Sequence, residues 1–257
     1  MSKKIAVGIV NLSDENTFLK CKKSLPSVDY IFSVHNTTDS NSLKYKHSYN
    51  RYISYGGLYN VILREILNTD ADYIFLIRSN LIIEHPSILE DYIKTAQVYG
   101  TWFMSRGDKE DKNIIVEDDI TKLNLCLYEN LAHNFIFMLK SHIKHFGFFN
   151  EGYHNFNADD RVNCLEAYDY YNKIESKMNY VPRGYFPDVE MSLAKITEIK
   201  AAHLRPNLKD KNTDNITRMY GQFYYNNKFI PGQHKTASKD KAITILENIQ
   251  KIYAAKN

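Results

Sequence analysis

Short apolar runs alternate with helix-like stretches along the first 100 residues of the chain. This alternation is the sequence pattern of βαβ units, which build a mostly parallel sheet. Each apolar run has the length of a strand that is buried on both faces of a sheet. The expected strands are residues 5–10, 30–34, 72–77, 101–105 and 135–139, with a further strand near 196–201.

Helices are expected around these strands, because apolar residues recur there at helical intervals. Pro26 would end the first helix, and Pro86 would occupy the first turn of the third, where its missing N–H is tolerated. The expected helices are residues 17–25, 57–67, 86–98, 158–178 and 239–254. The pattern therefore predicts the α/β class, with a mostly parallel central sheet flanked by helices.

Composition narrows the class of protein further. The chain has 257 residues, of which 44% are hydrophobic, with only 10 Gly and 6 Pro, so a packed domain is expected and a disordered or collagen-like chain is not. Cys21, Cys126 and Cys164 lie far apart, which predicts neither a disulfide framework nor a zinc site. No apolar stretch reaches the roughly 18–20 residues of a membrane-spanning helix. We expect a cytoplasmic protein without a membrane span.

The charge is distributed unevenly, although the net charge is only +3. Residues 1–198 carry 22 Lys and Arg against 26 Asp and Glu, whereas residues 199–257 carry 11 against 4. A basic end can bind an anionic partner, but charge runs often form only a solvated helix surface. The sequence is compatible with an anion-binding end and with a solvated helix surface.

Polar residues follow the predicted strands, and ligands bind beyond the carboxyl ends of strands in open α/β sheets. Candidate ligand contacts at the ends of the first three strands are Asn11, His35, Asn36, Arg78 and Asn80. No GxGxxG follows the first strand and the chain has no GxxxxGKS or GxxxxGKT. A Rossmann dinucleotide site and a P-loop are therefore disfavoured.

Five segments, in order, resemble the GT-A glycosyltransferases of family 2. The first segment is the first strand with the turn and helix that follow it. The second is His35-Asn36-Thr37-Thr38-Asp39, and the third is Ser54-Tyr55-Gly56-Gly57-Leu58-Tyr59-Asn60 together with the strand 72–77. The fourth is Gly147-Phe148-Phe149-Asn150-Glu151-Gly152-Tyr153, and the fifth is 158–167. The resemblance covers about residues 4–170 and extends more loosely to His203 and 224–229. It implies a GT-A-like, Rossmann-like transferase domain over 1–200, with a donor half at about 1–106 and an acceptor half at about 130–200. A basic C-terminal extension that ends in a helix would follow over 201–257.

The chain departs from this family where the family has an Asp-x-Asp that holds a divalent metal on the donor diphosphate. The corresponding residues here are Arg78-Ser79-Asn80. Arginine is a permanent cation whose planar fork of donors suits phosphate, so we expect Arg78 to replace Mn or Mg. The alternative is a decayed motif in a non-catalytic protein that binds nucleotide sugars or nucleic acid. His35 also stands in place of a family Asp, so the nucleotide base is not predicted.

The resemblance also implies the residues that would carry the reaction. Asp160, or its neighbour Asp159, would be the base that removes the acceptor proton, since the resemblance puts a carboxylate at this helix start, where the ionised form is favoured. The alternative is that both residues only cap the helix. The resemblance extends to His203 and Lys228, and the further expected donor-binding residues are Arg51, His203, Arg205 and Lys228.

These features predict an inverting glycosyltransferase, hexosyl or pentosyl, whose substrate is a nucleotide sugar. The inversion is implied by the resemblance alone. The acceptor hydroxyl would belong either to a saccharide or to a polyanion such as hydroxymethylated phage DNA, whose phosphates the basic extension would contact. The sequence predicts neither the donor sugar nor an oligomeric state.

Overall fold

The computed structural model describes most of the first half of the chain and part of the second. The described residues are 3–37, 39–49, 53, 55–101, 103–106, 124–128, 134–146, 148–149, 181–185, 240, 243, 244 and 247. The helix predicted at 158–178 and the strand near 196–201 lie outside them. Of the helix predicted at 239–254, the four described residues are helical.

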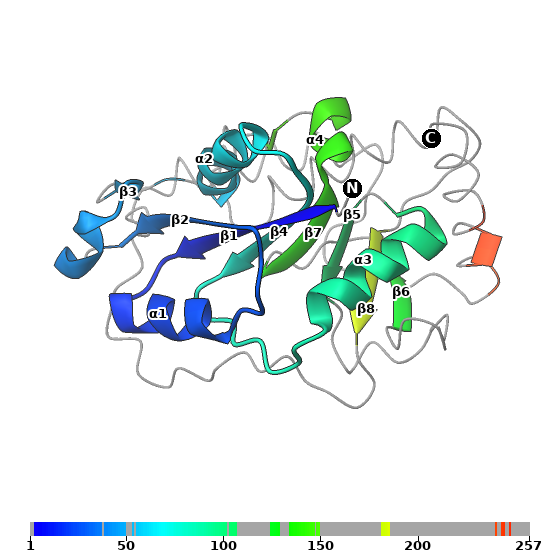
Figure 1. Ribbon diagram of the computed structural model, residues 1–257, viewed down its shortest axis with the longest axis horizontal. Coiled ribbons are helices and arrows are strands. Elements are labelled where there is room, and N and C mark those ends of the chain that lie inside the picture. The colour runs from blue at the N-terminus through cyan, green and yellow to red at the C-terminus, as the bar shows by residue number, and fades with distance from the viewer. Residues whose placement is uncertain are drawn as a thin grey trace, which may run out of the picture.

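One mixed sheet of eight strands organises the described residues (Figure 1). The strand order is β3-β2-β1-β4-β7-β5-β8-β6. Four of the seven neighbouring pairs are parallel, whereas β7 is antiparallel to both β4 and β5, and β6 is antiparallel to β8. The strands are β1 Lys4–Asn11, β2 Tyr30–Asn36, β3 Ser48–Tyr49, β4 Ala71–Arg78, β5 Phe103–Arg106, β6 Asn124–Tyr128, β7 Phe135–Leu139 and β8 Val181–Tyr185. The predicted α/β class is confirmed.

Helices cover both faces of this sheet. Helices α2 and α4 lie on one face, and α1 and α3 lie on the other (Figure 1). The helices are α1 Glu15–Ser24, η1 Ser40–Lys44 (a 3-10 helix), α2 Tyr55–Leu67, α3 Ile88–Tyr99 and α4 Lys140–Phe146. Among the described residues, none of these helices is long and apolar enough to cross a membrane.

The predicted start of the third helix is wrong by two residues. Pro86 lies before the cap of α3, and Ser87 is the N-cap residue. The carbonyl of Ser87 accepts the Asp91 N–H at 2.9 Å, and its Oγ donates to Asp91 Oδ2 at 2.6 Å. The Ser87 side chain makes no capping hydrogen bond to a backbone N–H, so α3 begins at Ile88 without a side-chain cap.

The apolar pattern did not predict η1, α4, β3, β6 or β8. Strand β8 contains Pro182 and Gly184, which are both disfavoured inside strands. Strand β3 has only two residues, and β6 is a five-residue run, too short for periodicity to separate a strand from a helix. The five strands predicted between residues 5 and 139 are all present, with ends that shift by at most two residues.

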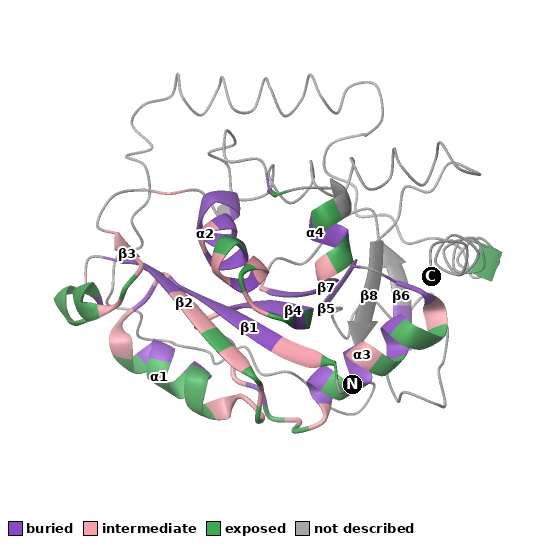
Figure 2. Cartoon of the chain, turned by 45° about the horizontal axis from the view of Figure 1, so that its top comes forward, coloured by how far each residue is buried: buried purple, intermediate pink, exposed green. Residues whose placement is uncertain are grey.

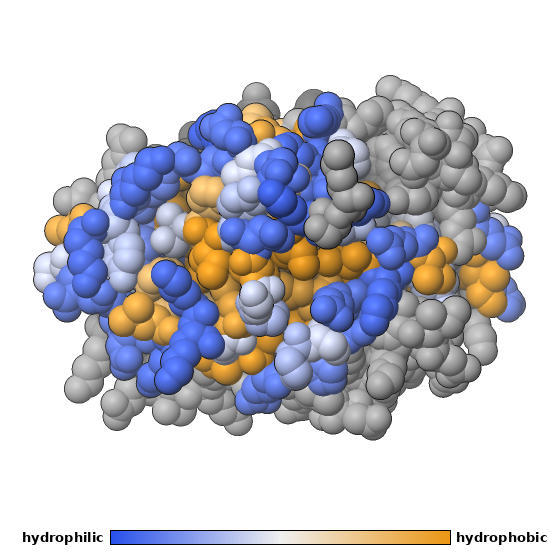
Figure 3. Space-filling model, viewed as in Figure 1, coloured by the Kyte–Doolittle hydropathy of each residue, from blue (hydrophilic) through white to orange (hydrophobic). Residues whose placement is uncertain are grey.

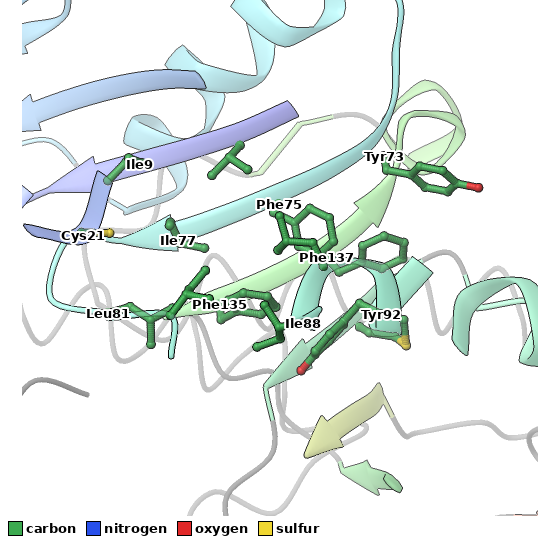
Figure 4. Close-up of a cluster of buried hydrophobic side chains, with 14 of the residues drawn as sticks. Ile9, Cys21, Tyr73, Phe75, Ile77, Leu81, Ile88, Tyr92, Phe135 and Phe137 are labelled. Carbon is green, nitrogen blue, oxygen red and sulfur yellow. The ribbon is translucent and has the colours of Figure 1, made fainter. Parts of the chain in front are cut away.

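The core consists of two apolar layers, one on each face of the sheet. Strands β1 and β4 are buried along most of their length (Figure 2). On the α1 and α3 face, Phe75, Phe135, Phe137 and Tyr92 pack as tilted or edge-on rings (Figure 4). On the other face, the side chains of α2 cover Ile74 and Leu76 of β4. Burial on both faces explains why β4 is a continuous apolar run.

The first half of β2 forms an open edge of the sheet. Strand β3 pairs only with His35 and Asn36, and no other described strand pairs with this side of β2. Ile31 is 40% exposed at this edge. In the view of Figure 1, apolar side chains gather between the polar surfaces of the helices (Figure 3).

Gly8 lets helix α2 approach strand β1 closely. A Cβ atom at this position would overlap Ile62 Cγ2 of α2 and lie 3.0 Å from Leu76 Cδ2 of β4. Both neighbours are buried, so neither can move freely. The absence of a side chain at residue 8 therefore sets the distance between the helix and the sheet.

We predict that Gly8→Ala lowers the free energy of unfolding by about 2 kcal/mol, because the added methyl overpacks the core. Urea titrations of both proteins measure the change. Ile62→Ala removes the overlapping atoms, so the double variant Gly8→Ala/Ile62→Ala should lose less stability than the sum of the single variants. Strictly additive losses would contradict this account of Gly8.

Candidate functional site

The carboxyl ends of four parallel strands meet at one edge of the sheet. The register places Asn11 of β1 opposite His35 of β2, and Val10 opposite Arg78 of β4. Strand β3 joins this edge, where Tyr49 lies opposite Asn36. The sequence placed its candidates Asn11, His35, Asn36 and Arg78 at strand ends, and the structure brings these residues together at this edge.

Asn11 links three strand ends through its buried amide. Its Oδ1 accepts hydrogen bonds from Ser79 Oγ at 2.7 Å and from the Ser13 backbone N–H at 3.1 Å. Its Nδ2 faces His35 Nδ1 at 3.2 Å. The side chains of Asn11, His35 and Ser79 are all buried. Together they make a fixed polar floor below the strand ends.

This network determines the protonation of His35. Because Asn11 Nδ2 donates, His35 Nδ1 must accept, so the ring proton lies on Nε2 and is donated to Ser33 Oγ at 3.1 Å. The ring is stacked on Tyr45, with centroids 4.0 Å apart, and meets Phe18 edge-on. Burial lowers the pKa of His35 to about 4, against a weaker opposing effect of Glu15 and Asp39. His35 is neutral at neutral pH.

Carboxylates occupy the N-terminus of helix α1 at the same edge. Asp14 Oδ1 accepts the Thr17 N–H at 2.7 Å, and Asp39 Oδ2 accepts the Glu15 N–H at 2.8 Å. The Lys44 ammonium and then the Tyr45 hydroxyl hold the pKa of Glu15 below its ordinary value. In dinucleotide-binding folds a phosphate takes the position that these carboxylates fill. A phosphate at this helix end would meet two negative charges, so it is disfavoured there.

The turn after β4 presents the cationic part of the edge. The Leu81 N–H donates to the Arg78 carbonyl at 3.0 Å, and the Ser79 N–H donates to the Val10 carbonyl at 2.9 Å, so the turn folds over the end of β1. Asn80 lies in this turn, and its Oδ1 is buried without a hydrogen-bond partner among the described residues. A buried acceptor of this kind is costly unless a ligand or water donates to it.

Asn134 joins this site and was not predicted. Its backbone carbonyl accepts the Arg78 N–H at 3.0 Å, which places it directly beside the end of β4. Its Oδ1 is also buried and lacks a partner among the described residues. The residues predicted at this edge, Asn11, His35, Asn36, Arg78 and Asn80, all end or follow strands. Because β7 is antiparallel to β4, a residue that precedes β7 lies at the same edge.

The residues described at this edge do not fit a divalent metal. Mg²⁺ and Mn²⁺ prefer carboxylate and other oxygen ligands. Here the strand ends in the guanidinium of Arg78, and the described residues contain no group of three or more His, Cys, Asp or Glu that could hold a metal. A fixed positive charge at this position would repel a cation.

The remaining predicted site residues divide into two groups. Asn36 is buried, and its Nδ2 donates to the Tyr49 carbonyl at 3.2 Å, so it fastens β3 to the edge. The others lie outside the described residues: Arg51, Asp159, Asp160, His203, Arg205 and Lys228. Their roles stay predictions.

Comparison with known proteins identifies the fold of the chain. No family model matches the chain, and no curated protein matches its sequence. Glucosyl-3-phosphoglycerate synthase from Mycobacterium tuberculosis, solved with Mn²⁺, UDP and glucosyl-3-phosphoglycerate, has a TM-score of 0.50 and 11% identity, over 92% of this chain and 87% of that chain.

Two further solved structures are similar at slightly lower scores. TarS from S. aureus has a TM-score of 0.48 at 14% identity, over 86% of this chain and 72% of that chain. A mannosyltransferase from Pyrobaculum calidifontis, solved with GDP-Man and Mn²⁺, has a TM-score of 0.49 at 10% identity, over 99% and 74%. The chain has the GT-A fold, and at these identities the likeness extends to the fold alone.

We predict that burial of neutral His35 makes the fold less stable as the pH falls from about 6.5 toward 4. The unfolded chain takes up this proton at the ordinary pKa and the folded chain only near 4, so the unfolded state binds more protons in this window. Between pH 7.5 and pH 5 the loss should be about 2 kcal/mol. Urea unfolding at the two pH values measures it. The variant His35→Gln should lack this component, and an equal loss in that variant would contradict the assignment.

Proposed function

We propose that this protein is a glycosyltransferase that moves a sugar from a nucleotide sugar to an acceptor hydroxyl. The observation that carries the proposal is the turn after β4, where Arg78 lies beside the orphaned amide oxygens of Asn80 and Asn134. A guanidinium binds a diphosphate, and amide oxygens accept hydrogen bonds from sugar hydroxyls. A glycosyl diphosphate carries a diphosphate and sugar hydroxyls next to each other. The GT-A fold and the position of this turn at its carboxyl edge support the same conclusion.

Arg78 would replace a metal ion in this reaction. As the bond between the sugar and the diphosphate breaks, negative charge grows on the leaving oxygen. A permanent cation at the end of β4 stabilises that charge without an exchangeable ligand. The carboxylates at the N-terminus of α1 favour the same arrangement, because they direct the diphosphate away from that helix and toward Arg78.

The chemical step would be a single displacement. The acceptor oxygen attacks the anomeric carbon, the bond from that carbon to the diphosphate oxygen breaks, and the acceptor proton passes to a carboxylate. We propose Asp160 as that base, with Asp159 as the alternative. Attack opposite the leaving group inverts the configuration at the anomeric carbon.

The proposed roles of Asn11, His35 and Asn36 are to support the donor. Their side chains are buried and bonded to Ser79, Ser33 and the backbone of Tyr49. These groups would fix the strand ends on which the nucleoside lies. Tyr45, stacked on His35, closes the floor from the side of η1.

The acceptor has two proposed classes, a saccharide and hydroxymethylated DNA. The basic segment that favours DNA lies outside the described residues. Binding to DNA that weakens steeply with salt would favour the second class, since phosphate contacts release counterions. Binding to sugar nucleotides without turnover would favour the non-catalytic alternative.

We predict that Arg78→Ala weakens binding of the cognate nucleotide sugar by about 10- to 100-fold, the loss expected for a hydrogen-bonded charge. Calorimetry with UDP-, GDP- and dTDP-sugars, in EDTA and in Mn²⁺, measures the affinity. Manganese should not restore it. Lys4→Ala is the matched control, because it removes one positive charge from the start of β1, at the opposite edge of the sheet. Unchanged affinity in Arg78→Ala would show that Arg78 does not hold the diphosphate.

For Asp160→Asn we predict unchanged donor affinity and loss of transfer, because the amide cannot take a proton. Release of nucleoside diphosphate measures turnover, and calorimetry measures binding. The matched control is Asp159→Asn, which should keep most of the activity. Normal transfer by Asp160→Asn with loss in the control would assign the base to Asp159, and normal transfer by both would refute a base in this pair.

A further inference from the structure

Asn60 of helix α2 holds the backbone of Phe149 by a reciprocal pair of hydrogen bonds. Its Nδ2 donates to the Phe149 carbonyl at 2.7 Å, and its Oδ1 accepts the Phe149 N–H at 2.9 Å. Both bonds are buried, and they join residues 89 positions apart. A side-chain amide has one acceptor and one donor face, so it pairs with a peptide unit as a neighbouring strand would.

Two more side chains of α2 contact the same segment. The Tyr59 ring lies 5.5 Å from the buried Phe149 ring. The Arg64 guanidinium lies over the Phe148 ring, 5.4 Å from its centroid. Asn60 and Arg64 are one turn apart and share a face of the helix. Helix α2 therefore holds residues 148 and 149 through two hydrogen bonds, one contact between aromatic rings and one cation–π contact.

These contacts direct the chain back to the carboxyl edge of the sheet. Strand β7 ends at the opposite edge, where Leu139 pairs with Tyr73 near the start of β4, and Lys140 Nζ donates to the Thr69 carbonyl there. Helix α4 begins at this point, and the last turn of α2 also lies near Thr69. Phe149 is bound at the second turn of α2, closer to the edge that carries Arg78.

We propose that Asn60 is a positioning residue for the transfer step, an inference that rests on the proposed function. The two hydrogen bonds between Asn60 and Phe149, here called the clasp, fix the point from which the chain continues. Asp159 and Asp160 follow Phe149 by ten and eleven residues. Asn60 touches neither the donor nor the acceptor in this account. Its loss should leave the donor site intact and displace the segment that carries the base.

The test is Asn60→Asp, which keeps the acceptor for the Phe149 N–H but turns a carboxylate oxygen toward the Phe149 carbonyl. We expect donor affinity by calorimetry to stay within twofold of wild type, while the rate of nucleoside diphosphate release at saturating donor falls at least tenfold. Leu63→Ala is the matched control, since it weakens packing of the same helix and leaves the clasp in place. It should keep the wild-type rate at temperatures well below its Tm.

Three results would overturn this role. Asn60→Asp could keep its rate, it could lose donor affinity together with rate, or Leu63→Ala could lose rate to the same extent. If Asn60→Asp does not fold, Asn60→Ser, which is smaller and uncharged, takes its place with the same expectations. Wild-type protein that binds a sugar nucleotide without turning it over would instead overturn the proposed function, and the role of Asn60 with it.

Discussion

Burial of β4 on both faces is the constraint on which the rest of the structure depends. One face of this strand packs against α1 and α3, the other against α2, and β1 and β7 flank it. A strand held on four sides leaves its last residue little freedom. Arg78 is that residue, so the cation of the proposed donor site is attached to a strand that is buried on both faces.

The charge distribution at the carboxyl edge of the sheet follows from two neighbouring features, the carboxylates at the N-terminus of α1 and Arg78 at the end of β4. Carboxylates close the helix end where many nucleotide-binding folds place phosphate, and the guanidinium of Arg78 stands where the sequence resemblance to GT-A enzymes of family 2 implies an Asp-x-Asp. The carboxylates disfavour phosphate at the helix end, and the guanidinium disfavours a metal ion at the end of β4. Among the residues that the structure describes at this edge, the end of β4 is then the position that favours an anion.

The apolar periodicity predicted strands β1, β2, β4, β5 and β7 and helices α1, α2 and α3, because these elements are buried along a continuous face. It also predicted that Asn11, His35 and Arg78 share a site, since parallel strands end at the same edge. Asn134 could not be found in this way, because its place depends on the antiparallel insertion of β7. The pairing of Asn60 with Phe149 depends on tertiary packing across 89 residues and has no local signal.

The place of β7 in the sheet has a consequence for how the chain is made. Strands β4 and β5 both precede β7 in sequence, yet β7 lies between them and is the strand that joins them. During synthesis, β5 leaves the ribosome before β7 has been made. The apolar residues of β5 therefore stay unpaired until residues 135–139 have emerged. The first 106 residues contain β3, β2, β1 and β4, but β5 joins these strands only after residues 135–139 have emerged.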